Sequence, residues 1–74
     1  SMAFAENSKT RKVVDYLAEG RTLTAAQALA RFGIKNLSAT MSSIKDTVEY
    51  YGNWEVTKDT ARNGATKYGI IRLS

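Results

Sequence analysis

The sequence predicts a small α+β domain in which three short helices are followed by a C-terminal β-hairpin. Apolar residues recur at helical spacing as far as Val48, and from Trp54 onward β-branched and aromatic residues dominate. An Asn63-Gly64 pair, the strongest short signal for a hairpin turn, divides that tail. The 74 residues suffice for one domain and not for two.

Composition narrows the function classes. The chain has no Cys and no His, which excludes disulfides and the usual zinc sites, and we expect no cofactor. Its glycines are scattered, without a phosphate-cradling loop, so an enzyme is not expected. No apolar stretch approaches the roughly 18 residues of a membrane span, and no signal-peptide core is present, so a cytoplasmic location is expected. A net charge of +4 favours polyanionic partners.

The N-terminal lead-in, residues 1–7, has no clear period, and its Ser1 resembles a cloning scar. We therefore expect the folded domain to span residues 8–74. Its first helix runs from Lys9 to Glu19, with Ser8 as the N-cap and Gly20 as the left-handed residue that ends it. The apolar positions of this helix are Val13, Val14, Leu17 and Ala18.

The second helix follows a short extended connector, in which Thr22 and Leu23 are expected to add an edge strand. Thr24 and Gln27 have the spacing of a capping box, so this helix begins at Ala25. Gly33 ends it after two turns.

The third helix begins after Asn36, a suitable N-cap, and has a narrow apolar stripe. The stripe consists of Leu37, Met41, Ile44 and Val48. At 100° per residue, the opposite face is small and polar. It carries Ser38, Ala39, Ser42, Ser43 and Asp46, with Lys45 at its margin.

Two strands are predicted around the Asn63-Gly64 turn, but the inward face of the second is ambiguous. Either Ile71 and Leu73 point toward the core or Tyr68 and Ile70 do, and we favour the first pair. A two-stranded hairpin is marginal by itself, so it must dock on the helices. The predicted arrangement is thus a winged helix-turn-helix: three helices with a C-terminal β-hairpin wing. Of the aromatic residues before the hairpin, one or two should close the core, and the rest suit an interface with a second copy. These are Tyr50, Tyr51 and Trp54.

The stretch LTAAQALARFGIKNLSATMSSIK resembles the small helix-turn-helix proteins of tailed bacteriophages. Their pattern runs roughly L-T-x-x-x-A-L-x-x-[FY]-G-I-x-R-L-A-A-R-I-x-D-L-R, followed by a hairpin wing. The matching residues are Leu23, Thr24, Ala28, Leu29, Phe32, Gly33, Ile34, Leu37 and Ala39, and Met41, Ile44 and Lys45 match in kind. The resemblance implies a winged helix that binds DNA, in the host cytoplasm if the protein is viral. Asn36 and Thr40 stand where the pattern favours Arg, and Ser43 where it has Asp.

A helix-turn-helix places its second helix in the major groove of DNA, where side chains near the helix start contact base edges. Small residues would let the helix sit deep in that groove, and Asn36 could pair with adenine. Basic side chains of the turn and the wing would contact phosphates or the minor groove. The predicted DNA-binding residues are Lys35, Asn36, Ser38, Ala39, Ser42, Ser43, Lys45, Lys58, Arg62 and Lys67.

Two other interpretations remain open. The serine-rich face could be merely solvated, and the charged hairpin an ordinary protected edge. Alternatively, the same fold could bind and modulate a host protein, which the missing Arg residues at Asn36 and Thr40 favour. We expect double-stranded DNA as the partner, with a homodimer as a companion hypothesis, because operators are usually bound by two copies.

Overall fold

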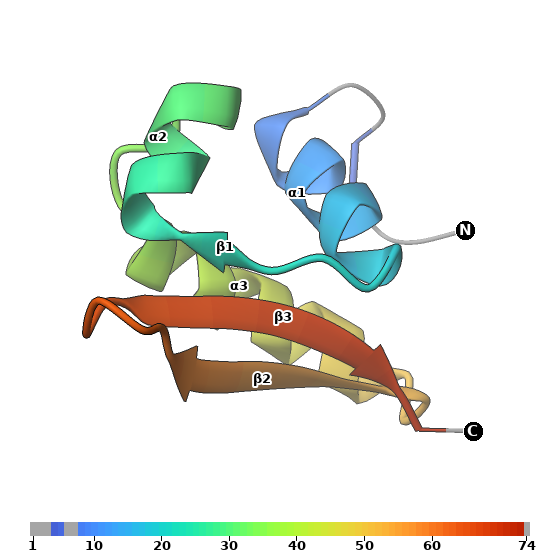
Figure 1. Ribbon diagram of the computed structural model, residues 1–74. Helices are drawn as coiled ribbons and strands as arrows, with labels where there is room; N and C mark the ends of the chain where they lie inside the picture. The colour runs from blue at the N-terminus through green and yellow to red at the C-terminus, as the bar shows by residue number, and fades with distance from the viewer. Residues whose placement is uncertain (1–3, 6–7, 74) are drawn as a thin grey trace.

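The part of the chain that the structure describes forms three helices and three strands, and their order agrees with the prediction. The computed structural model describes residues 4–5 and 8–73. The strands form one antiparallel sheet in the order β1-β3-β2, and the helices cover one of its faces (Figure 1). In chain order, the elements are α1 (Lys9–Ala18), β1 (Leu23–Thr24), α2 (Ala25–Phe32), α3 (Leu37–Tyr50), β2 (Trp54–Thr60) and β3 (Thr66–Arg72).

The capping residues of α1 and α2 are those that the sequence predicts. The Ser8 hydroxyl accepts a hydrogen bond from the Arg11 amide at 3.0 Å. Thr24 and Gln27 form the reciprocal capping box that begins α2. Helix α1 ends one residue earlier than predicted, because Glu19 is its C-cap. Gly33 ends α2 with φ +67°, a left-handed conformation that a residue with a Cβ rarely adopts.

The hairpin turn also lies where the sequence places it. Gly64 adopts φ +88°, and its amide donates to the Ala61 carbonyl at 2.9 Å. On the other side of β3, Leu23 of β1 pairs with Tyr68. The predicted edge strand is thus present, shifted by one residue to Leu23–Thr24.

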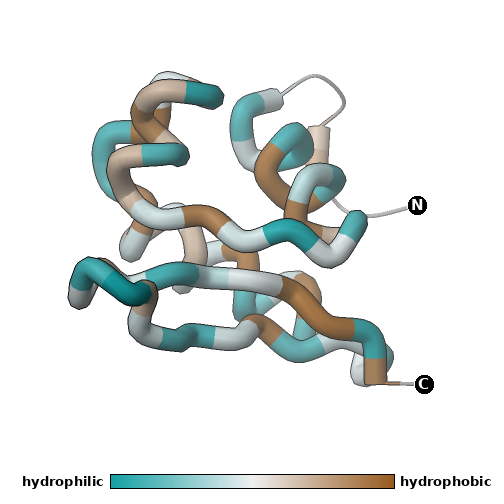
Figure 2. The backbone as a smooth tube through the Cα atoms, in the orientation of Figure 1, coloured by the Kyte–Doolittle hydropathy of each residue, from teal (hydrophilic) through white to brown (hydrophobic). Residues whose placement is uncertain are grey.

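The apolar residues meet in one core between the helices and the inner face of the sheet. Figure 2 shows brown, hydrophobic stretches on α1, β1 and β3, separated by teal, hydrophilic ones. The predicted stripe of α3 is entirely buried. Among the described residues no polar side chain is buried with the core, so the burial of apolar side chains holds the helices and the sheet together. The buried residues are Val13, Val14, Leu17, Leu23, Ala28, Ile34, Leu37, Met41, Ile44, Val48 and Ile70.

The face of β3 that packs on the core is the opposite of the one that we favoured. Ile70 is 4% exposed, whereas Ile71 is 46% and Leu73 54% exposed, so the expectation that Ile71 and Leu73 point inward is wrong. Neighbouring side chains of a strand point to opposite faces, and burying those two would also have buried Lys67 and Gly69. A charge and a gap would then have entered the core.

Gly69 instead lies on the outer face, between two threonines of the neighbouring segments. A Cβ built at this glycine would lie 2.8 Å from the Thr57 Oγ1 and 3.4 Å from the Thr22 Cγ2. The threonines therefore leave no room for a larger residue, and this close approach helps to fix which face of β3 is outside.

The N-terminal segment and the aromatic residues complete the packing. Phe4 is partly buried against the core, although it belongs to the predicted lead-in. Residues 1–3, 6–7 and 74 lie outside the described part, so the expectation that Ser1 is a cloning scar falls there too. Trp54 also packs on the core, as predicted for one aromatic residue, whereas Tyr50 and Tyr51 are exposed. This α+β layout is compatible with a winged helix. None of the helices in the described residues is long and apolar enough to span a bilayer.

Candidate nucleic-acid interface

Helix α3 presents two accessible surfaces beside its buried stripe. Its cap is the Asn36 side chain, whose Oδ1 accepts from the Ala39 amide at 3.1 Å. Ala39, Ser43 and Asp46 recur on the side directly opposite the core and are exposed. The second surface turns toward the hairpin and carries Ser38, Ser42, Lys45 and Glu49.

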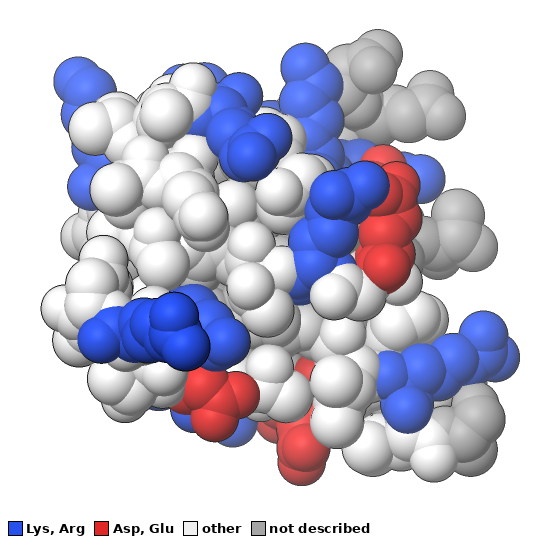
Figure 3. Space-filling view, viewed as in Figure 1, with Lys and Arg blue, Asp and Glu red and all other residues white. Residues whose placement is uncertain are grey.

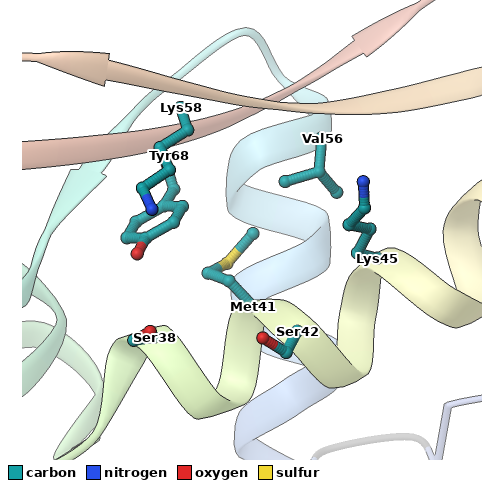
Figure 4. A pocket seen from close by; sticks show the side chains of 7 residues that line it. All are labelled: Ser38, Met41, Ser42, Lys45, Val56, Lys58 and Tyr68. Atoms are coloured by element: carbon teal, nitrogen blue, oxygen red, sulfur yellow. The ribbon is translucent and has the colours of Figure 1, made fainter.

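A groove separates this second surface from the hairpin, and we call it the α3–hairpin groove (Figure 4). Its volume is about 210 Å³. Two ammonium groups and three hydroxyl groups surround an apolar floor, a set that suits an anion attached to a less polar group. The lining residues are Ser38, Met41, Ser42, Lys45, Val56, Lys58 and Tyr68.

The strand register determines which hairpin side chains line this groove. Lys58 and Tyr68 are directly opposite each other in the β2–β3 pair, so both side chains lie on the inner face, toward α3. Val56, two residues before Lys58, lies on the same face and forms the floor together with Met41. The groove is therefore a product of pairing across the hairpin.

Glu49 connects the two walls. Its Oε2 accepts a hydrogen bond from the Val56 amide of β2 at 3.1 Å, and its Oε1 lies 3.4 Å from the Lys45 Nζ. A carboxylate of α3 thus contacts both the backbone of the hairpin and a lysine of the groove.

A second groove lies at the N-terminal end of α3, where α1 approaches the turn before that helix. Its volume is about 440 Å³. The Lys9 Nζ donates to the Gly33 carbonyl at 3.2 Å and so holds the turn against α1. The lining residues are Lys9, Thr10, Gly33, Ile34, Lys35, Asn36, Ala39 and Thr40.

Three cations lie toward the turn of the β2–β3 hairpin. We define this basic end as Lys58, Arg62 and Lys67; in the described part of the chain no ion pair joins these three to a carboxylate. Asp59 is an acidic residue of the same region and lies opposite Lys67 in the sheet. Figure 3 shows Lys and Arg side chains over the hairpin end at the left, with a smaller acidic area below them.

Two arginines elsewhere are paired with carboxylates. Arg11 pairs with Asp15 on α1, and Arg21 pairs with Glu19, each at 3.1 Å. The hydrogen bond and the charge of Glu19 raise the pKa of Arg21. These arginines have local counterions, so they attract a polyanion less than the basic end does.

The structure divides the predicted DNA-binding residues among several surfaces. Ser38, Ser42, Lys45 and Lys58 meet in the α3–hairpin groove, and Lys35, Asn36 and Ala39 line the second groove. Ser43 faces outward from α3, and Arg62 lies in the hairpin turn. Lys67 is not brought to the groove: the register places it on the outer face of the sheet, opposite Asp59.

The structure gives Asn36 a second role, since its Oδ1 caps α3. A bidentate contact with adenine would need the same oxygen as an acceptor. Tyr68 and Glu49 belong to this region but were not predicted as site residues. Tyr68 faces the groove because it pairs with Lys58, and the alternation of the strand alone could have suggested this once the register was known.

Neither a metal site nor a known relative assigns a function to these surfaces. Among the described residues, no group of three or more carboxylates lies close enough together to hold a metal ion. Searches against protein-family models, curated proteins and solved structures find no match for this chain. Function is therefore inferred from the α3–hairpin groove and the basic end.

Proposed function

We propose that this protein is a winged helix-turn-helix protein that binds double-stranded DNA. The observation that carries the proposal is the α3–hairpin groove, with Lys45 and Lys58 on opposite walls, beside a basic end whose cations form no ion pair with a described carboxylate. In this assignment α2 and α3 form the helix-turn-helix, and the β2–β3 hairpin is the wing.

The geometry suits a duplex in two respects. The outward face of α3 has small side chains at Ala39 and Ser43, which allow close approach within a major groove about 12 Å wide. The α3–hairpin groove then faces the DNA strand that borders the major groove, where its ammonium and hydroxyl groups bind a backbone phosphate. The proposal therefore assigns base contacts to the outward face and phosphate contacts to the groove.

A role as a small phage-type regulator or nucleoid-directed factor follows from the sequence resemblance, and such a role requires a location with the host DNA. A dimer is part of the proposal. Tyr50, Ile71 and Leu73 are exposed at the end of the hairpin farthest from its turn, so a second copy there would leave the basic end free. Analytical ultracentrifugation with and without duplex DNA measures the oligomeric state.

The salt dependence of duplex binding tests the proposal. Each phosphate contact contributes about −0.9 to the slope of log K against log salt. We expect Lys58→Gln to weaken binding and to reduce the magnitude of the slope by about that amount. Lys12→Gln is the control, because it removes the same charge from an exposed position on α1, outside the groove and the basic end. A salt-independent wild-type affinity would contradict DNA binding, and equal effects of the two variants would contradict the groove as the contact.

A protein-interaction module of the same fold is the second candidate. The observations that favour it are Asp46, a carboxylate on the outward face of α3, and the strongly exposed Tyr50 beside it. A carboxylate repels phosphates, and exposed tyrosines are common at protein interfaces. Two results together would favour this candidate over the first. A host protein would be captured from nuclease-treated lysate, and the affinity for duplex DNA would not change with salt.

A further inference from the structure

Glu49 uses both carboxylate oxygens between α3 and the hairpin. One oxygen accepts the Val56 amide at 3.1 Å, and the other is 3.4 Å from the Lys45 ammonium. The Glu49 side chain is 33% exposed, against 57% for Lys45, so the carboxylate is the more enclosed partner. A partly enclosed contact with two partners is better defined than a surface ion pair.

The Val56 amide needs a partner because of its place in the sheet. Strand β2 is at the sheet edge, and backbone groups along an edge strand point alternately toward the neighbouring strand and away from it. The amide of Val56 points away from β3, as its bond to Glu49 shows. Thr57, the next residue, therefore directs its amide toward β3.

We infer that Glu49 is a positioning residue of the α3–hairpin groove. Its bond to Val56 holds the hairpin at a fixed separation from α3, and its contact with Lys45 directs that lysine along the groove wall. The consequence for DNA rests on the proposed function, whereas the contact with Val56 is a property of the free protein.

The two contacts of Glu49 act on a bound polyanion in opposite directions. The bond to Val56 preorganises the groove, which favours binding. The negative charge offsets the attraction of Lys45 for phosphate and so opposes binding. Glu49→Gln retains an amide oxygen that can accept from Val56 but removes the charge, whereas Glu49→Ala removes both.

The experiment compares duplex affinity and amide hydrogen exchange in Glu49→Gln, Glu49→Ala and Glu55→Gln. Glu55 is an exposed carboxylate on the outer face of β2, so Glu55→Gln makes the same change in net charge away from the groove. At low salt we expect Glu49→Gln to tighten binding by up to about fivefold. The effect of Glu55→Gln should be smaller, and Glu49→Ala should bind more weakly than Glu49→Gln.

Exchange of the Val56 amide in the free protein tests the contact separately. It should become about tenfold faster or more in Glu49→Ala and stay slow in Glu49→Gln, with the Thr57 amide as the internal reference in the same fold. Unchanged Val56 exchange in Glu49→Ala would overturn the inference, and so would equal affinity gains in Glu49→Gln and Glu55→Gln. Faster exchange in a protein that binds no DNA would support the contact and reject only the proposed function.

Discussion

Asp46 lies on the outward face of α3, on the same side of the helix as Ser43 and Ala39. If this face enters the major groove, its carboxylate approaches the phosphates, and its charge opposes binding. If the face is turned away from DNA, dissolved salt screens the charge over a distance of about 10 Å at 0.1 M ionic strength. The orientation of α3 on DNA can thus be measured at this single residue.

We expect Asp46→Asn to increase duplex affinity, because it removes that repulsion and retains a side chain of the same size. The gain should be about 0.2–1 kcal/mol, the range of single exposed charge interactions, and should shrink as salt is added. Fluorescence anisotropy at two salt concentrations measures it. Glu55→Gln on the outer face of β2 is the control, because Glu55 is exposed and belongs to none of the described ion pairs. An equal gain there would assign the effect to net charge and not to the face of α3.

Helix α3 contributes three different surfaces: a buried core stripe, an outward face and one wall of the α3–hairpin groove. Its orientation depends on its first turn, where Asn36 caps the Ala39 amide and Lys9 holds the preceding turn through the Gly33 carbonyl. Residues of this turn therefore affect stability first and ligand contacts second.

Two substitutions at Asn36 separate those effects. Asn36→Ala removes the cap and should lower the free energy of unfolding by about 0.5–2 kcal/mol. Asn36→Asp keeps an acceptor and places a negative charge at the positive end of the helix, so stability should be close to that of the parent. Urea denaturation measures both variants. A large loss of stability in Asn36→Asp would show that the cap is not the main role of this side chain.

At the scale of the whole molecule, the thin apolar core carries the stability. The chain contains no cysteine, and the three described ion pairs are all partly or largely exposed, so each contributes little. Natural domains are stable by about 5–15 kcal/mol, and a single core residue can account for a large part of that.

A matched pair of leucines tests this dependence. Leu17 of α1 is 0% exposed, and Leu29 of α2 is 54% exposed. Leu17→Ala should lower the free energy of unfolding by about 2–5 kcal/mol through lost burial and the cavity left behind, whereas Leu29→Ala should cost below about 1 kcal/mol. Thermal denaturation followed by circular dichroism compares the two. Similar losses would mean that Leu29 is covered in solution by a second copy or another partner.

The elements were predictable because their signals are local. Caps at Ser8, Thr24 and Asn36 satisfy the first amides of each helix, and Gly33 and Gly64 adopt conformations that other residues rarely reach. These preferences act within a few residues of the chain and need no knowledge of distant contacts. The same holds for the stripe of α3, whose burial follows from spacing alone.

The candidate site was predictable only in part. Ser38, Ser42, Lys45 and Lys58 were all named from the sequence, but their meeting in one groove depends on the register that places Lys58 opposite Tyr68. The same register places Lys67 on the outer face. Glu49 could not be found from its neighbours in sequence, because its partner is a backbone amide seven residues away across a turn.

The amino-acid sequence by itself determined the number and order of the elements and the residues that cap the helix starts, since helix caps, glycine turns and apolar spacing act over short stretches of chain. The tertiary structure alone decided which face of β3 is buried and which lysines face α3. The apolar pairs Tyr68–Ile70 and Ile71–Leu73 differ by one step of the strand, and the choice between them needs contacts with distant residues. Leu23 across from Tyr68, Val56 across from Ile70, and the threonine beside Gly69 supply those contacts.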